Sequence, residues 1–240
     1  MNNALTALEA RVRADLARTA HPEAAWLTPK LGPADRPALD VLVVGAGQSG
    51  LATAFGLMRS QVSNILVLDK SEEGQEGPWL SYARMHTLRS PKHFTGPDLD
   101  IPSLTYQSWH EARFGEEDWR KLDLIPRALW AEYLLWFRRV VDIPVRNGCE
   151  VIDISPAAGG LLAAKVQTSV GVDTLVCAQD CAGDGAGGHG RLDRSRTIAR
   201  SARVALRAHR AADRFRPPAR QTGCGDRRRR VRLRQCRGCA

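Results

Sequence analysis

Three glycines near the start of the chain have the spacing of a loop that binds the phosphates of a dinucleotide. The loop follows the pattern G-x-G-x-x-G and consists of Gly45, Ala46, Gly47, Gln48, Ser49 and Gly50. In such loops the first glycine permits a tight turn, the second lets the backbone approach the pyrophosphate, and the third lets a helix pack closely on a strand. Free N–H groups at the start of that helix then face the phosphates. The spacing therefore predicts a dinucleotide site; the alternative is an ordinary glycine turn.

The residues around the loop predict the elements that such a site requires. A nearly all-apolar run over 39–44 predicts a buried strand before the loop, and the run over 51–59 predicts a helix after it. A second apolar strand over 65–68 ends in Asp69. An acid at this position accepts hydrogen bonds from ribose hydroxyls and disfavours a 2′-phosphate. Asp69 and the adjacent Lys70 are therefore predicted to bind FAD or NAD, between which the glycine pattern alone does not choose.

The rest of the pattern predicts an α/β protein with a Rossmann-like parallel sheet covered by helices on both faces. Further helices are predicted over 4–18, around 108–114 and over 127–141, and further strands over 145–154 and 162–168. Four prolines mark 21–37 as an irregular linker. The stretch 71–126 is rich in Gly, Pro and polar residues, and a long irregular stretch is uncommon in a compact domain unless it serves a function.

Charge is divided unevenly along the chain. Residues 1–178 hold 18 Lys and Arg and 21 Asp and Glu, a net charge of −3, whereas residues 179–240 hold 17 Arg and five Asp, a net charge of +12. Affinity for nucleic acid would thus belong to 179–240 alone. That segment has no Trp or Tyr on which bases could stack, so a nucleic-acid partner is not expected.

Composition also bears on metal binding and location. Cys236 and Cys239 form a C-x-x-C, but the second pair that a zinc site needs is missing, so no metal is predicted. The chain has no run of about 18 apolar residues that would predict a membrane span. Its first 18 residues mix charged with apolar side chains, unlike a secretory signal. A cytoplasmic protein without a membrane partner is expected.

The segment after the second predicted strand resembles a known family. The runs Gly77-Pro78-Trp79 and Tyr82–Lys92 (YARMHTLRSPK) are similar to the corresponding segment of the flavin-containing, NADPH-dependent monooxygenases, and the resemblance covers about residues 40–178. It implies that this segment passes the flavin and that a later strand contacts adenine through its backbone. The residues to which it assigns these contacts are Trp79, Arg84, His86, Thr87, Leu88 and, for adenine, Val151. Taken alone, Trp79 is equally well explained as a core aromatic residue.

The resemblance also implies a function. The loop at Gly45–Gly50 becomes an FAD site, NADPH becomes the reductant, and the reaction takes a small-molecule substrate and O₂. No catalytic residue is assigned, because in flavin chemistry the cofactor performs the reaction and the protein orients it. Two alternatives stay open: an NAD(P)-dependent dehydrogenase with its cofactor at the same loop, and a dinucleotide-binding module with a basic nucleic-acid-binding tail.

The Arg-rich tail has a further interpretation. Read in another frame with suitable wobble bases, residues 220–239 permit the sequence GKRVAVIGAGASAFDNAAVA, an apolar strand followed by a second glycine loop. We therefore predict that the chain changes frame near 178–179. The predicted division is an N-terminal helix and linker (1–38), an FAD-binding domain (39–178) and a disordered, out-of-frame tail (179–240). A chain of this kind lacks the NADPH site and is expected to be weakly active or inactive.

Overall fold

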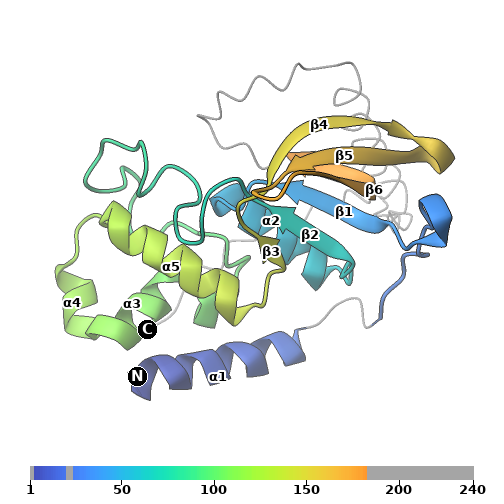
Figure 1. The fold of residues 1–240 in the computed structure, drawn as a ribbon. Helices are drawn as coiled ribbons and strands as arrows, with labels where there is room; N and C mark the ends of the chain where they lie inside the picture. Colours follow the sequence, from blue (N-terminus) through green and yellow to red (C-terminus); the bar gives the residue numbers. More distant parts are fainter. Residues whose placement is uncertain (1–2, 20–23, 183–240) are drawn as a thin grey trace, which may run out of the picture. The chain divides into compact units, whose positions relative to one another are not determined.

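Six strands form one sheet that carries the glycine loop (Figure 1). The computed structural model describes residues 3–19 and 24–182. Across the sheet the strands follow the order β3–β2–β1–β6–β5–β4. Their bounds are β1 (Leu39–Val44), β2 (Ile65–Leu68), β3 (Val145–Arg146), β4 (Glu150–Ala157), β5 (Leu161–Gln167) and β6 (Val172–Ala182).

The half of the sheet around β1 is parallel. β1 pairs in parallel with β2 on one side and with β6 on the other, and β2 pairs in parallel with β3. Helix α2 (Gln48–Arg59) connects β1 to β2, so the glycine loop lies at the C-terminal end of β1. This strand–loop–helix–strand unit confirms the predicted Rossmann-like α/β fold.

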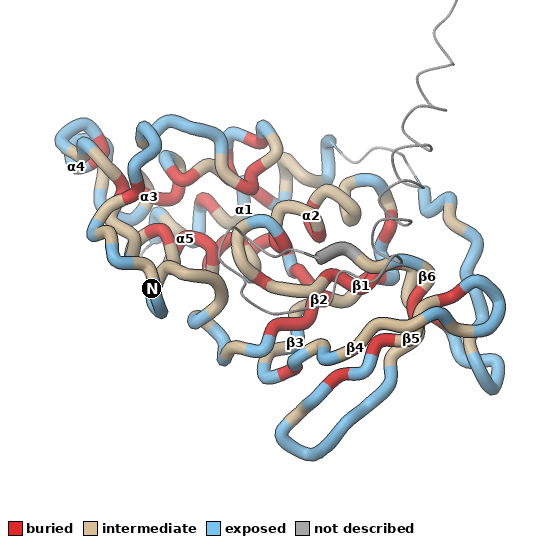
Figure 2. The backbone as a smooth tube through the Cα atoms, turned by 90° about the horizontal axis from the view of Figure 1, so that it is seen from above, coloured by how far each residue is buried: buried red, intermediate tan, exposed pale blue. Residues whose placement is uncertain are grey.

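One face of the sheet packs against helices. Besides α2, the described helices are α1 (Asn3–Arg18), α3 (Tyr106–Phe114), α4 (Glu116–Lys121) and α5 (Arg127–Val140), and short 3-10 turns occur at Pro33–Asp35, Pro102–Leu104 and Ala158–Gly160. Val43 and Val67 of the central strands share a buried cluster with Phe55 of α2 and Phe137 of α5, and the two phenylalanine rings meet edge to face at 5.4 Å. Figure 2 shows buried positions along β1, β2 and α5. The cluster fixes α2, and with it the loop that α2 follows.

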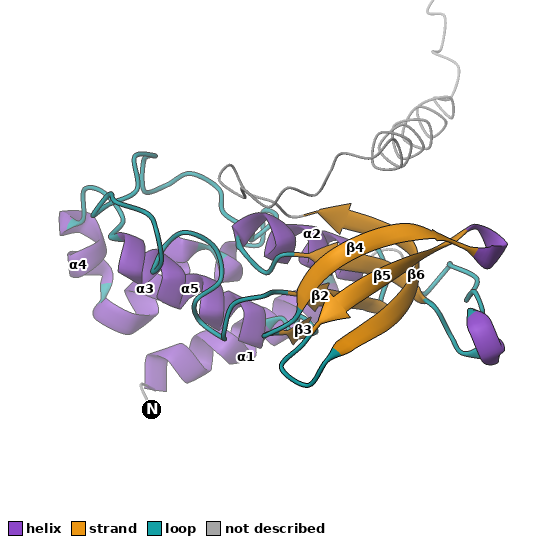
Figure 3. Cartoon of the chain, turned by 45° about the horizontal axis from the view of Figure 1, so that its top comes forward, coloured by secondary structure: helices purple, strands orange, loops and turns teal. Residues whose placement is uncertain are grey.

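The other face is covered by strands, not helices. Leu42 and Leu68 form a second buried cluster with Ala164 and Val166 of β5, and in the described part of the chain no helical residue joins it. The antiparallel strands β4, β5 and β6 run as long neighbours (Figure 3). The sheet is therefore mixed, and the prediction of a parallel sheet with helices on both faces is corrected: the β4–β5 hairpin takes the place of the second helical layer.

Several element boundaries also differ from the prediction. The single strand predicted over 145–154 is divided into β3 and β4, because Gly148 adopts a positive φ of 65° between them. Helix α4 is only six residues long and too short to show a pattern. The pattern after Thr168 is too weak to predict a strand, yet β6 runs to Ala182, four residues past the predicted boundary at 178. The rest of the Arg-rich tail lies outside the described residues.

Neither long apolar helices nor metal-binding clusters occur in the part of the chain that the structure describes. No helix there has the length and apolar character needed to cross a membrane. No group of three or more His, Cys, Asp or Glu side chains among residues 3–19 and 24–182 could hold a metal ion. Cys236 and Cys239 fall outside these residues.

Candidate dinucleotide-binding site

Two of the three loop glycines are required by the fold itself. Gly45 has a φ of 97°, a conformation that side chains rarely tolerate, and its N–H donates to the carbonyl oxygen of Leu68 at 2.7 Å. A Cβ on Gly50 would lie 1.8 Å from the carbonyl oxygen of Gly45. Any side chain at either position would force the turn or the helix–strand contact apart.

The middle glycine is not required by the fold. Gly47 has a φ of −67°, which any residue adopts, and it is the N-cap of α2. The nearest atom to a Cβ built there is the Cα of Gly77 at 3.6 Å, an ordinary contact distance. The protein therefore leaves room for a side chain at position 47, yet none is present. A ligand that approaches this backbone closely accounts for the glycine, and the N–H groups at the start of α2 suit a phosphate.

Asp69, at the end of β2, binds backbone amides on two sides. One carboxylate oxygen accepts from the N–H of Ala46 at 2.7 Å and the other from the N–H of Ser71 at 2.8 Å, and the residue is 8% exposed. Hydrogen bonds from N–H groups to a carboxylate are roughly twice as strong as neutral ones. The carboxylate thus fixes the glycine loop to the end of β2. Each oxygen keeps lone pairs with which it can still accept from a ribose hydroxyl.

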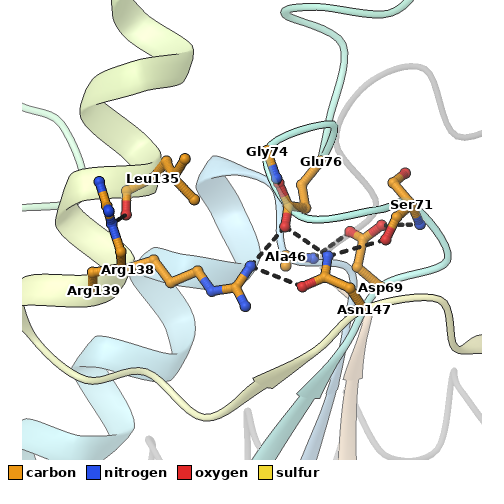
Figure 4. Close-up of polar contacts among 9 residues, drawn as sticks. All are labelled: Ala46, Asp69, Ser71, Gly74, Glu76, Leu135, Arg138, Arg139 and Asn147. Atoms are coloured by element: carbon orange, nitrogen blue, oxygen red, sulfur yellow. Dashed lines mark hydrogen bonds and ion pairs between the residues drawn. The ribbon is translucent and has the colours of Figure 1, made fainter.

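The loop after β2 is held by a polar network (Figure 4). Arg138 of α5 donates to Glu76 at 2.7 Å and to the side-chain oxygen of Asn147 at 2.9 Å. The amino group of Asn147 donates to Glu76 at 2.7 Å and to the carbonyl of Ser71 at 3.0 Å, while Glu76 also accepts from the N–H of Gly74 at 2.7 Å. Arg138 and Glu76 are 13% and 10% exposed. Three chain segments are thereby fixed next to the glycine loop.

Trp79 lies beside the glycine loop. It lines a small crevice with Ala46 and Leu51, and its ring meets Trp130 of α5 edge to face at 6.3 Å. Its carbonyl accepts a hydrogen bond from Arg127. Its indole nitrogen is buried and has no partner among the described residues. An unpartnered buried donor at this place fits a cofactor that supplies the acceptor.

The segment predicted to pass the flavin is fixed against the start of α5. The carbonyl oxygen of His86 accepts a hydrogen bond from the N–H of Arg127 at 3.0 Å, and the N–H of Leu88 donates to the carbonyl oxygen of Ile125 at 2.8 Å. Between these two bonds, Thr87 forms an antiparallel bridge with Pro126. Leu88 is buried, whereas the side chains of Arg84 and His86 are exposed. The structure thus brings the backbone of 86–88 to the end of α5 that also contacts Trp79.

The side chains of the other predicted site residues have fewer defined contacts. Ser49 is exposed, and Lys70 is exposed with its nitrogen 4.0 Å from Glu150. Val151 is half-buried on β4, an edge strand with a register shift next to it. An edge strand leaves backbone groups unpaired, as a backbone contact to adenine requires.

A separate pocket lies within the segment 92–107. It has a volume of about 290 Å³ and is lined by residues such as Lys92, Asp98 and Tyr106, none of them a predicted site residue. The polar groups near it are largely engaged: Lys92 donates to two carbonyls at 2.6 Å, and Asp98 accepts from Gly96 at 2.8 Å. Burial raises the pKa of Tyr106, a member of the aromatic cluster behind the pocket.

Some residues of the site could not be predicted from the sequence. Glu76, Arg138 and Asn147 belong to segments far apart in the chain, and no local spacing connects them. Gly77 is recognisable only as part of the Gly-Pro-Trp run; in the structure its Cα lies next to Gly47. Trp130 reads as one residue of an apolar stripe, yet its indole N–H bonds the side chain of Gln48 at 3.2 Å.

The glycine loop lies at the C-terminal end of a parallel strand, a helix begins directly after it, and an acid ends the next strand. These features together define a dinucleotide-binding α/β protein. The model of the FAD-NAD(P)-binding family matches residues 42–179. The chain belongs to this family, for which FAD and NAD(P)H are the cofactors.

Individual relatives agree with this assignment. The FAD-dependent urate hydroxylase of Xanthomonas campestris pv. campestris is 48% identical over 154 residues, which make up 64% of this chain and 32% of that protein. The chain thus spans about a third of the length of this curated relative. The match confirms the predicted class: an FAD-binding part like that of FAD-dependent hydroxylases.

Solved structures show the same fold. The ornithine N-hydroxylase of Kutzneria sp. 744 aligns with a TM-score of 0.51 at 19% identity, over 61% of this chain and 37% of that one. The ornithine hydroxylase of Pseudomonas aeruginosa aligns with a TM-score of 0.51 at 18% identity, over 60% and 38%. At these identities the likeness extends to the fold alone.

Proposed function

We propose that this chain is the FAD-binding part of an FAD- and NADPH-dependent monooxygenase, and that FAD binds at the loop Gly45–Gly50. The observation that carries the proposal is Gly47, the one loop glycine that neither backbone conformation nor packing requires. The likeness to an FAD-dependent hydroxylase supports FAD over NAD as the cofactor.

The residues of the chain have distinct tasks in this proposal. The N-terminal amides of α2 hold the pyrophosphate, and Asp69 accepts the ribose hydroxyls while it keeps the loop in place. Trp79, with the backbone of 86–88, forms the wall beside the ring system, and Val151 meets the adenine. Bound FAD supplies the redox chemistry, and these residues orient it and exclude water.

We further propose that residues after about 178 are read out of frame, so that this chain lacks the NADPH site. Strand β6 offers support. Its register pairs Asp180 with the fully buried Leu42 of β1, and burial raises the pKa of the Asp180 carboxyl. A carboxylate beside the centre of a parallel sheet is unfavourable, since such strands are normally apolar. A chain of this kind binds FAD and turns over little or no substrate.

The complete protein, in this proposal, is cytoplasmic and oxygenates a small molecule with O₂. The name of the 48%-identical relative makes urate the first compound to test.

The proposal is tested on the purified full chain by titration with FAD and by its absorption spectrum. We expect a flavin spectrum that stays with the protein through gel filtration, and no NADPH oxidation above that of free FAD. A protein that binds NAD but not FAD would be a dehydrogenase-like domain instead. NADPH oxidation that depends on urate would contradict the loss of the NADPH site.

A further inference from the structure

A hydrogen bond connects the glycine loop to α5. The indole N–H of Trp130 donates to the side-chain oxygen of Gln48 at 3.2 Å, across 82 residues of sequence. Gln48 is the first residue of α2 and directly follows Gly47. The bond therefore ends at the place where the phosphates of a dinucleotide would lie.

The chemistry of the two groups determines how the amide of Gln48 is turned. An indole nitrogen only donates, so the partner atom on Gln48 must be the oxygen. The amino group of Gln48 then points elsewhere, and it makes no hydrogen bond to the residues that the structure describes. Two N–H donors are thus available at the start of α2, beside the amides that already face this space.

Trp130 is itself held rigidly. It is 4% exposed, and its ring lies 5.1 Å from that of Tyr133 and 5.5 Å from that of Tyr106. A Cβ added to Gly96 would meet the ring at 3.1 Å, so the backbone also closes on it. The indole N–H therefore has little freedom to turn away from Gln48.

We propose that Trp130 is a positioning residue for the cofactor: it turns the amide of Gln48 so that the amino group donates to an acceptor oxygen of the bound dinucleotide. The inference rests on the proposed FAD site and adds a specific route by which α5 contributes to it. Trp130 does not touch the cofactor in this account and acts through Gln48 alone.

The test compares FAD affinities, measured by flavin fluorescence, for the full chain and its variants. Trp130→Phe keeps most of the ring and loses the N–H. Trp136→Phe is the matched control, because Trp136 lies on the same helix, is 3% exposed and has an indole nitrogen without a partner. We expect FAD to bind about five- to tenfold more weakly to Trp130→Phe, as for the loss of one hydrogen bond, and within about twofold of wild type to Trp136→Phe.

Two changes at Gln48 separate positioning from packing. Gln48→Leu removes the amide, and in its presence Trp130→Phe should have no further effect on FAD affinity. Gln48→Glu keeps the acceptor for Trp130 but replaces the amino group with a negative charge, so it should weaken binding at least as much as Gln48→Leu. The position is only half-buried, so these variants remain informative even if Trp130→Phe does not fold.

Equal affinities of Trp130→Phe and Trp136→Phe, additive effects of Trp130→Phe and Gln48→Leu, or wild-type affinity of Gln48→Glu would each overturn the inference. Failure of the wild-type chain to bind FAD is a different result: it would overturn the proposed function, and the inference with it.

Discussion

Strands β2 and β6 flank β1 on opposite sides, and an aspartate lies near or just after the C-terminal end of each. Asp69 directly follows β2 and accepts two backbone amides, from Ala46 and Ser71. Asp180 lies within β6, paired with Leu42, and burial raises the pKa of its carboxyl, which a hydrogen bond to its own backbone amide offsets only in part. The same side chain is thus satisfied at one edge of β1 and poorly accommodated at the other.

The difference shows what a built site requires. The end of β2 is held by Asp69 and by the network of Glu76, Arg138 and Asn147, all with defined partners. At the end of β6, the register alone brings Asp180 next to buried residues. Of the two carboxylates, only that of Asp69 therefore holds the glycine loop in place.

Loss of the Asp69 carboxylate should have the largest effect in this comparison. Asp69→Ala leaves the N–H groups of Ala46 and Ser71 without their acceptor, and we expect the free energy of unfolding to fall by about 3 kcal/mol, with loss of FAD binding. Urea unfolding and FAD titration measure the two effects. Asp69→Asn keeps one acceptor oxygen and should recover part of both; a stability of Asp69→Ala equal to wild type would contradict the role of Asp69 in holding the loop.

Loss of the ion pair behind the loop should rank second. Arg138→Ala leaves Glu76 buried without its cationic partner, and removing one partner of a buried pair costs about 3–5 kcal/mol. We expect about 2 kcal/mol here, because both side chains keep some exposure to water. The neighbouring Arg139→Ala is the control: this side chain is exposed and bonds only a carbonyl of its own helix, so its effect should stay within about 0.5 kcal/mol. Equal unfolding midpoints in urea for the two variants would show that the network of Glu76, Arg138 and Asn147 does not stabilise the fold.

The smallest effect, with the opposite sign, is expected at Asp180. A folded-state pKa above the unfolded value of about 3.9 means that the folded chain holds its proton more tightly. Stability from this group is therefore present below the unfolded pKa and is lost as pH rises through the folded pKa. Asp180→Asn should be more stable than wild type at pH 7, and the difference should vanish toward pH 3, as followed by thermal unfolding across pH.

Asp173→Asn provides the control for this change, since Asp173 is an exposed aspartate on the same strand. Because the side chain is exposed, the stability of this variant at pH 7 should lie within about 0.5 kcal/mol of wild type. If Asp180→Asn were less stable than wild type at pH 7, Asp180 would have a favourable native contact, and the support that β6 lends to a frame change would be lost.

Local spacing was sufficient to predict the central unit of the fold. The bounds of β1 and β2 agree with the nearly all-apolar runs over 39–44 and 65–68, because strands buried on both faces need predominantly apolar sequence. The structure also bears out the steric reasons given for Gly45 and Gly50.

Contacts between segments that are distant in the chain could not be predicted from the sequence. Nothing in an apolar stripe shows that the Trp130 indole faces Gln48, and the bonds of Arg138 depend on how α5 meets the loop after β2. The hairpin β4–β5 replaces a helical layer, which no periodicity in 145–168 could indicate. Whether the site residues bind FAD stays a prediction.

Substitution of Gly50, which is buried within α2, and of Gly47, the N-cap of that helix, gives a direct test of whether FAD binds at this loop. Gly50→Ala places a Cβ 1.8 Å from the carbonyl oxygen of Gly45 and should unfold the domain. Gly47→Ala meets no atom closer than 3.6 Å, so its stability without FAD should stay within about 1 kcal/mol of wild type. Its FAD affinity, measured by titration, should fall at least about tenfold. A Gly47→Ala chain that folds and binds FAD as tightly as wild type would contradict the assignment of this loop as the FAD site.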